Sequence, residues 1–503
     1  MKNKNTFFFL LFFFSSIHLI FSQRDNTYTL DASAIIGTSQ TPFWMRANKF
    51  GKAPTEGQTL AIFAGLKSDY QNPEKKVDWG YGLNIGGFAG FQNKAIIQQA
   101  YAKAKWRVFE FYAGRREEIQ GLVDTTLSSG SYIWSGNALP MPKIDISIPE
   151  YTSIGPSGVF SIKGNYAHGW FDRKRDDAVG VMLHQKSGYF RIGKSNWKFK
   201  AYAGLNHQVQ YGGKIQFDDP NGYYSKGGRF GSSFRDYIYL VTGRSAVGED
   251  TAKFSGSGET LNRVGNHLGT MDIALEFKHK NGKVFFYRQN IFEDGSLYYL
   301  NNITDGLNGL SISFNDNNSE KVFNVKKIVI EFLNTQNQGG LFYDDPRLPG
   351  IRGYDQYFNN TQFRDGWSYQ KTSLGTPFIM SKNEFPQLIS KPNPSKLMFT
   401  NNRIQAYYFG LEGNILNKNY ITGRLSFTKN WGMFGIDFAN EKFQTSFSLN
   451  SNQYFPTILG GVNGYVNLAG DFGELLNQNF AIQLGLKKSF GFLPFLHKTH
   501  SHF

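Results

Sequence analysis

The stretch FKAYAGLNHQVQ, residues 199–210, decides the fold, because its apolar and polar side chains alternate with a period of two. The odd positions, from Phe199 to Val209, carry Phe, Ala, Ala, Leu, His and Val, whereas the even positions carry Lys, Tyr, Gly, Asn, Gln and Gln. Successive side chains of a β-strand point to opposite faces, so the stretch predicts a strand with one apolar and one polar face. It is longer than the ~9–11 residues that a tilted strand needs to cross a membrane.

The same alternation recurs later in the chain. Residues 443–449 read FQTSFSL, and residues 480–487 read FAIQLGLK, after which Phe490 and Phe492 continue the pattern. The polar faces consist of Gln, Asn, Ser, Gly and Lys, which suits a wet interior. Between two further strands, the sequence KNGK at 280–283 predicts a tight type I′ hairpin with Asn281 and Gly282 at the positions that need φ above zero. Such short turns lie on the periplasmic side of an outer-membrane barrel.

Composition agrees with a membrane barrel, although a soluble carbohydrate-binding β-protein can also be rich in aromatic residues. Aromatic residues make up 17% of the chain, with 48 Phe and 27 Tyr, and membrane barrels carry aromatic girdles at both interfaces. The mean hydropathy is −0.40, and helical periodicity is almost absent. We therefore predict one all-β domain, residues 23–503: a transmembrane antiparallel β-barrel of about 16–18 strands. Long polar stretches are predicted as outer loops or a lumenal plug: 218–235, 243–266 and 339–394.

The first 22 residues predict export and an outer-membrane location. Lys2 and Lys4 precede an apolar run from Phe7 to Phe14, and cleavage is expected after Ser22, as in a Sec-type signal peptide. A retained anchor fits less well, because the run is short of the ~20 apolar residues of a spanning helix. Removal of these residues takes two lysines and no acid, so the net charge falls from +15 to +13. The absence of cysteine excludes disulfides and thiolate chemistry.

One segment goes beyond a generic barrel. Residues 111–151 contain FYAGRR, then LSSGSYIWSGNALPMPKI, and end in IPEY. Four more stretches belong with this segment: TPFWMRAN at 41–48, RVGNHLG at 263–269, YRQN with EDGSL at 287–297, and RDGWSY at 364–369. Together they resemble the Wzi-type capsule assembly proteins of Bacteroidota-like bacteria, over about residues 42–368.

The resemblance implies a monomeric outer-membrane barrel of about eighteen strands with a plugged lumen. It also implies a non-catalytic, lectin-like role in assembling capsular or extracellular polysaccharide or attaching it to the cell surface. The expected partners are that polysaccharide, with an acidic one suiting the basic chain, and outer-membrane lipid. No nucleic acid partner and no cofactor are expected.

Several residues in these stretches suit a sugar ligand, which needs flat apolar surfaces, planar polar groups and, for uronates, cations. The predicted polysaccharide-binding residues are Arg115, Arg116, Trp134, Asn137, Arg288, Asp294, Arg364, Asp365 and Trp367. Two structural alternatives stay open. The arginines can end a strand and pair with acids such as Glu117, Glu118 and Asp294, as in the ionic networks of large barrels. Trp134 and Trp367 can belong to an aromatic girdle.

Metal, enzyme and channel functions have weaker signals. The stretch NDNNSE at 315–320 lacks the spacing of a calcium loop, and His207, His267 and His279 lack the spacing of metal ligands, so no metal site is expected. The sequence GSG at 256–258 is not a hydrolase nucleophile elbow. A glycosidase pair needs two carboxyls ~5–10 Å apart, and the candidate acids are Glu150, Asp294 and Asp365. No spacing in the sequence requires such a pair, so we expect no enzyme. The second function considered is an anion-preferring porin, which an inward fold of 339–394 would oppose.

Overall fold

The computed structural model describes residues 24–38, 40–72, 74–244, 263–293, 300–315, 322–341, 353–384 and 396–491. The predicted signal peptide, residues 1–22, lies outside this part of the chain. Within it, no helix combines the length and the apolar character that a membrane span requires.

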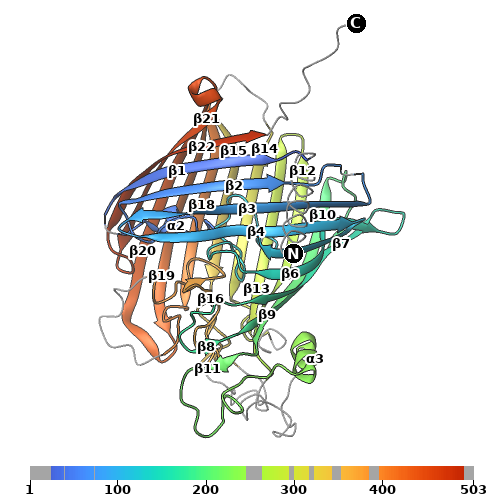
Figure 1. The fold of residues 1–503 in the computed structure, drawn as a ribbon, viewed down its shortest axis with the longest axis vertical. Helices are drawn as coiled ribbons and strands as arrows, with labels where there is room; N and C mark the ends of the chain where they lie inside the picture. The colour runs from blue at the N-terminus through green and yellow to red at the C-terminus, as the bar shows by residue number, and fades with distance from the viewer. Residues whose placement is uncertain are drawn as a thin grey trace, which may run out of the picture.

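Eighteen strands of the described chain form one closed antiparallel sheet. Each pairs with the next barrel strand along the chain, and the pairing of β1 (Thr27–Gly37) with β22 (Asn479–Gly491) closes the barrel (Figure 1). The others are β2 (Thr59–Ser68), β3 (Val77–Gly90), β4 (Lys94–Trp106), β5 (Phe109–Arg115), β6 (Lys143–Ile154), β7 (Phe160–Trp170), β9 (Met182–Ile192), β10 (Phe199–Tyr211), β12 (Asn266–His279), β13 (Gly282–Glu293), β14 (Gly306–Phe314), β15 (Phe323–Asn334), β18 (Ile404–Ile415), β19 (Asn419–Met433), β20 (Ile436–Phe455) and β21 (Val462–Gly473). The predicted fold class is confirmed, with a strand number inside the predicted range.

The predicted alternation separates the outer wall from the lumen. In β10, Phe199 is 58% exposed on the outer face, whereas Gln208 and Gln210 are fully buried on the inner face. Exposed aromatic residues gather near the ends of the strands, as a pair of interfacial girdles requires. At one rim these include Trp79, Trp106, Phe160, Phe199 and Phe277, and at the other rim Trp170, Phe443, Phe472 and Phe480. The barrel is therefore a transmembrane one.

The two rims differ in the length of their connections. One rim has short turns, such as 107–108 between β4 and β5, and both ends of the barrel domain, at β1 and β22. The opposite rim has long connections at 38–58, 116–142, 212–265 and 335–403. Short turns mark the periplasmic side of an outer-membrane barrel, so the long connections lie on the outer side.

The hairpin predicted at 280–283 forms, but the predicted turn type is wrong. His279 pairs with Gly282, so Lys280 and Asn281 make the turn, and neither has a positive φ. Gly282 instead begins β13 with φ of 154°, and a Cβ there would collide with the Ser313 carbonyl oxygen of β14. Close approach of the neighbouring strand, rather than the turn, requires this glycine.

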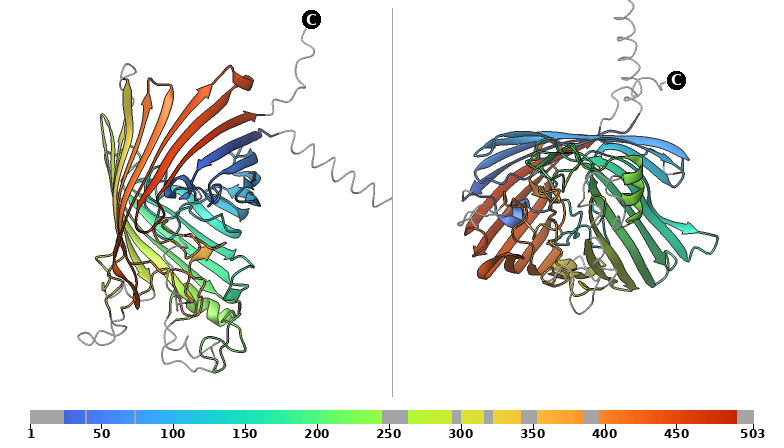
Figure 2. Two further views of the ribbon diagram at one scale, coloured as in Figure 1. Left: turned by 90° about the vertical axis from the view of Figure 1, so that its left-hand side faces the viewer. Right: turned by 90° about the horizontal axis from the view of Figure 1, so that it is seen from below.

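A plug built from inward-folded outer connections fills the lumen, and Figure 2 shows these segments inside the ring of strands. It comprises 38–58 with α2 (Phe43–Arg46), 116–142, and 353–384 with the hairpin of β16 (Ser368–Tyr369) and β17 (Thr372–Ser373). The connection 171–181, with β8 (Ala178–Val179), is hydrogen-bonded to the plug near the outer rim. Trp44, Tyr132 and Trp367 of the plug are almost completely buried in the apolar core. The predicted plug segment 339–394 is thus one of several contributors, through its described part.

The connection between β10 and β12 stays outside the lumen. There β11 (Lys214–Ile215) pairs with β8, and α3 (Phe234–Thr242) follows near the outer rim (Figure 1). The sequence analysis did not predict this helix. The sequence signal for α3 was the pair Ser233 and Asp236, which form a reciprocal capping box at the N-terminus of the helix. Gly243 ends the helix in a left-handed conformation. A short 3₁₀ helix, η4 (Ile458–Gly460), lies in the turn between β20 and β21.

Candidate functional site

Eight of the nine predicted sugar-binding residues are described, and they lie in three places: the outer end of β5, the plug segments and the outer wall. Arg115 and Arg116 lie at the outer end of β5, and the next four lie in the plug: Trp134, Asn137, Asp365 and Trp367. Arg364 flanks Asp365 and faces the outer loops. Arg288 lies on the outer wall, and Asp294 lies outside the described residues.

Arg116 belongs to an ionic network. Its guanidinium contacts Glu110 Oε1 at 2.5 Å and Glu118 Oε1 at 3.0 Å, and Lys143 Nζ lies 2.5 Å from Glu118 Oε2. Burial would raise the pKa of Glu118, but the charges of Lys143 and Arg116 hold it below its usual value. The predicted pairing of Arg116 with Glu118 is thus observed.

The same network reaches the plug through Trp134. Lys143 Nζ lies 4.8 Å from the centroid of the Trp134 ring, a cation–π contact in a largely buried setting. Trp134 therefore lies inside the barrel and not in a girdle.

Arg115 connects two of the sequence segments from which the sugar-binding residues were predicted. Its Nη2 donates to the Tyr369 hydroxyl at 2.8 Å, although the two residues are 254 positions apart. Nearby, Asn137 Nδ2 donates to the Ser373 carbonyl at 3.3 Å, and Asn137 Oδ1 accepts from the Asn48 backbone at 3.3 Å. The structure thus brings 111–143 and 364–373 together.

Asp365 is an anchor inside the plug. Its carboxylate accepts hydrogen bonds from the backbone N–H groups of Asp176, Asp177 and Ala178 at 3.0–3.2 Å, and it pairs with Arg175 at 3.4 Å. These contacts fasten the connection between β7 and β9 to the plug.

The neighbours of Asp365 make different contacts. The Arg364 guanidinium lies 3.5 Å from the Phe217 ring centroid, over the outer loop that contains Phe217. Trp367 is fully buried and packs against Phe171, so the girdle alternative is wrong for Trp367 as well. A role in glycan binding stays a prediction for these residues.

Arg288 does not join the others. It shares the outer face of β13 with Phe286, which is exposed, and it donates to Asn308 Oδ1 at 2.6 Å and to the Ile303 carbonyl at 2.5 Å. The alternation of Val284, Phe286 and Arg288 in the sequence was the signal for this outward direction.

A polar crevice opens beside the joined segments. Its volume is about 80 Å³, and it lies between the outer turn of β3 and β4 and the plug. Cations, amides, an aromatic residue and one acid line it: Arg46, Lys94, Gln92, Asn137, Tyr369, Gln370 and Glu384. Lys94 Nζ donates to Gln370 Oε1 at 3.1 Å, and Arg46 pairs with Glu384 at 3.4 Å. We call this group of residues the mouth crevice.

Sequence reasoning missed two cations of the mouth crevice. Arg46 stands in the stretch at 41–48 that carried the resemblance, but Lys94 has no signal of its own, because only the fold brings it to the plug. A small cavity on the other side of Leu139, lined by Arg116, Glu118 and Trp134, continues the same region.

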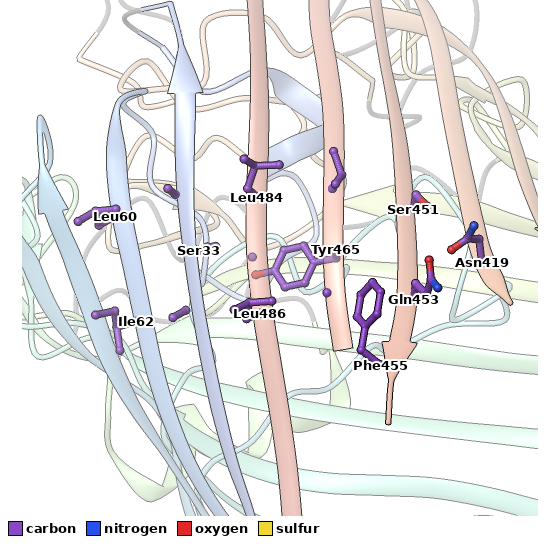
Figure 3. Close-up of a pocket in the computed structure, with 15 residues that line it drawn as sticks. Ser33, Leu60, Ile62, Asn419, Ser451, Gln453, Phe455, Tyr465, Leu484 and Leu486 are labelled. Atoms are coloured by element: carbon purple, nitrogen blue, oxygen red, sulfur yellow. The ribbon is translucent and has the colours of Figure 1, made fainter. Parts of the chain in front are cut away.

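A much larger cavity, of about 570 Å³, lies away from all these residues. Figure 3 shows its lining on the strands where the barrel closes, with Leu60, Ile62, Leu484 and Leu486 contributed by β2 and β22. These leucine and isoleucine side chains are about half exposed on the outer wall. The groove therefore faces the acyl chains of the membrane rather than a sugar.

The arrangement of the described side chains gives little support to metal binding or to glycosidase chemistry. His207 Nε2 lies 2.9 Å from His267 Nδ1, but no cluster of three or more metal-ligating side chains occurs in the described ranges. The carboxylate of Asp365, one of the acids considered for a glycosidase pair, is committed to backbone donors and to Arg175.

Comparison with known proteins yields no family model and no curated protein that matches. Similar solved structures include Pseudomonas aeruginosa OccK5 (OpdH), with 8% identity, a TM-score of 0.47, and 93% of this chain and 98% of that chain covered. Pseudomonas aeruginosa OpdQ has 8% identity, a TM-score of 0.45, and coverages of 93% and 99%. The outer membrane channel DcaP of Acinetobacter baumannii has 9% identity, a TM-score of 0.36, and coverages of 93% and 96%.

At these identities and TM-scores the likeness concerns barrel architecture and carries no argument about function. The Wzi-type resemblance accordingly stays a prediction from the sequence. What the strands, their faces and their closure establish is a transmembrane β-barrel of the outer-membrane type.

Proposed function

We propose that this protein binds a capsular or extracellular polysaccharide without catalysis and holds it at the outer membrane, as the Wzi-type resemblance implies. The observation that carries the proposal is the mouth crevice, where segments distant in sequence meet beside the packed plug. Its amides suit sugar hydroxyls, and Lys94 suits a carboxylate.

Deletion of the gene in its host, followed by staining of the cell-attached polysaccharide, tests this function. We expect the attached layer to be lost and to return with the wild-type gene. Complementation with Lys94→Gln should restore it poorly, because the crevice loses a cation, whereas Lys194→Gln, in an exposed turn on the periplasmic rim, should restore it fully. A deletion strain with a normal attached layer would refute the proposal.

The second candidate is an anion-preferring channel. The similar solved structures include a BenF-like porin from Pseudomonas fluorescens and the outer membrane channel DcaP by title, and this function is closer to those titles than polysaccharide attachment is. The observation in its favour is the set of partly exposed cations on the inner wall, including Lys163, Arg191 and Lys487. Planar-bilayer recordings decide it: anion-selective steps from the purified protein support a channel, and absence of conductance removes it.

A further inference from the structure

The end of the segment that carried the family resemblance forms an unusual bulge in the barrel wall. Ile148 of β6 pairs with Gly164 of β7, and Thr152 then pairs with Ile162, so residues 149–151 lie opposite Lys163 alone. Pro149 has no N–H to lose from the ladder, which makes the bulge a tolerated place for it. Because the bulge adds two residues, it keeps the alternation of faces, and Tyr151 lies on the lumenal side like Lys143 and Asp145.

Tyr151 meets two other aromatic side chains of the inner wall. Its ring centroid lies 5.4 Å from that of Tyr202, and Tyr202 lies 6.0 Å from Phe285. Tyr202 and Phe285 alternate with outward residues in β10 and β13, so both face the lumen. All three are only partly buried, which leaves ring surface available to a ligand.

Two cations lie beside these rings. The Arg191 guanidinium is 5.2 Å from the Tyr151 ring centroid, and Lys163 Nζ is 5.8 Å from it. Arg191 Nη2 donates to Ser161 Oγ at 2.9 Å, while its buried Nε has no hydrogen-bond partner. Neither cation forms an ion pair with a residue in the described ranges, in contrast to the neighbouring Lys200, which pairs with Glu276 at 2.6 Å.

The position of this group is on the periplasmic side of the plug. Tyr151 lies near the end of β6, and Tyr202 and Phe285 lie near the starts of β10 and β13, all toward the rim with the short turns. We call Tyr151, Tyr202, Phe285, Lys163 and Arg191 the lumenal aromatic patch.

We propose that the lumenal aromatic patch is a binding site for an acidic saccharide, in which the rings contact sugar faces and Arg191 and Lys163 pair with a carboxylate. The inference rests on the proposed function and adds a second, periplasm-facing place of contact with an acidic ligand. The planar guanidinium of Arg191 can engage both oxygens of a carboxylate.

Equilibrium binding of fluorescently labelled tri-galacturonic acid to the purified full-length barrel tests the proposal, with labelled maltotriose as the neutral probe. We expect the acidic probe to bind more tightly and Arg191→Gln to weaken it about 10-fold or more, the effect of a lost charge-assisted hydrogen bond. Tyr151→Leu should weaken binding, whereas Tyr151→Phe, which keeps the ring, should retain it. Lys487→Gln is the matched control, because it removes a lumenal charge from β22, outside the patch. Heat-modifiable migration on gels verifies that each variant is folded.

Equal binding of the acidic probe by wild type, Arg191→Gln and Tyr151→Leu would overturn the patch while leaving polysaccharide binding elsewhere intact. Absence of acidic-probe binding by the wild type would also overturn it, and the staining of deletion cells would still decide the proposed function separately. Loss of binding in Arg191→Gln and Tyr151→Leu, with Lys487→Gln unaffected, supports the patch.

Discussion

Single buried carboxylates of the barrel wall hold the plug. Glu331 of β15 accepts hydrogen bonds from Ser128 Oγ at 2.6 Å and from the Ser129 backbone N–H at 2.7 Å, and it also accepts one from the Tyr287 hydroxyl. Asp272 of β12 plays the same role for the Leu122 backbone N–H, at 2.8 Å. Buried donors without an acceptor are costly, so each carboxylate ties a loop that has no strand partner to a rigid wall.

The first prediction concerns Glu331→Ala. The change leaves three buried donors without their acceptor, and we expect the free energy of unfolding to fall by on the order of 3 kcal/mol. Urea titration in detergent, followed by tryptophan fluorescence, measures it. Glu441→Ala removes an exposed carboxylate that pairs with Lys429 and should leave the midpoint nearly unchanged. Equal shifts in the two variants would contradict an anchoring role.

The second prediction concerns Lys49 of the plug. Burial, together with the charges of Arg424 and Lys52, lowers the pKa of Lys49 to about 7. Between that value and the usual 10.5 the unfolded chain binds more protons than the folded one, so this residue makes stability rise with pH from about 7 toward 10. Urea midpoints at pH 7 and pH 9 should therefore differ more in wild type than in Lys49→Met. The exposed Lys75→Met should keep the wild-type difference, and an unchanged pH dependence in Lys49→Met would refute this assignment.

At the scale of elements, α3 covers polar side chains on the outer wall. Leu240 packs on Val209 and Tyr211 of β10, and the Tyr237 hydroxyl lies 2.8 Å from that of Tyr166 on β7. His184 of β9 and His207 of β10, on the same outward face, are buried. Polar groups on the lipid-facing side of a barrel are costly, and the helix separates these from the membrane. Its own Phe234 and Ile238, one turn apart, remain exposed.

The third prediction follows from this packing. Leu240→Ala opens a cavity under α3 and should destabilise the protein by about 3 kcal/mol, whereas Phe234→Ala, at an exposed position of the same helix, should change it by less than about 0.5 kcal/mol in detergent. Urea titration compares the two variants. Trypsin cleavage at Arg235 and Arg244 should also become faster in Leu240→Ala only. Identical behaviour of the variants would show that α3 does not rest on the wall.

At the scale of the molecule, the sheet closes without the plug, although the plug is anchored to the wall. The barrel closes through backbone pairing of β1 with β22, which does not involve the plug. The plug residues Trp44, Tyr132 and Trp367 are buried in an apolar core that also includes inner-wall residues such as Phe63 and Tyr408. Damage to that core should therefore loosen the lumen without opening the sheet.

The fourth prediction tests this separation with Trp367→Ala. The variant removes a fully buried ring from the plug, and we expect larger or more frequent conductance in planar bilayers than the wild type gives. Heat-modifiable migration on gels should remain, because the barrel strands are unchanged. Trp197→Ala, at an exposed turn on the short-turn rim, should match the wild type in both measurements. A variant that no longer migrates as a folded barrel would contradict independence.

Local sequence patterns were sufficient to predict the barrel. The period of two in 199–210, 443–449 and 480–487 assigns each side chain to a face, because successive residues of a strand always point in opposite directions. The same rule, applied to Val284, Phe286 and Arg288, places Arg288 on the outer wall and separates it from the plug. The error at Asn281-Gly282 arose because the need for glycine came from β14, a strand outside the local sequence.

The sequence alone determined a membrane barrel with a strand number in the right range, long outer connections and a segment able to enter the lumen. Only the tertiary structure decided which connections fill the lumen, that Arg115 meets Tyr369, and that Lys94 reaches the mouth crevice. The physical reason is that strand direction is a local property of the backbone, whereas a plug has no period. Its irregular segments are positioned by individual hydrogen bonds to the wall, between residues that can be hundreds of positions apart.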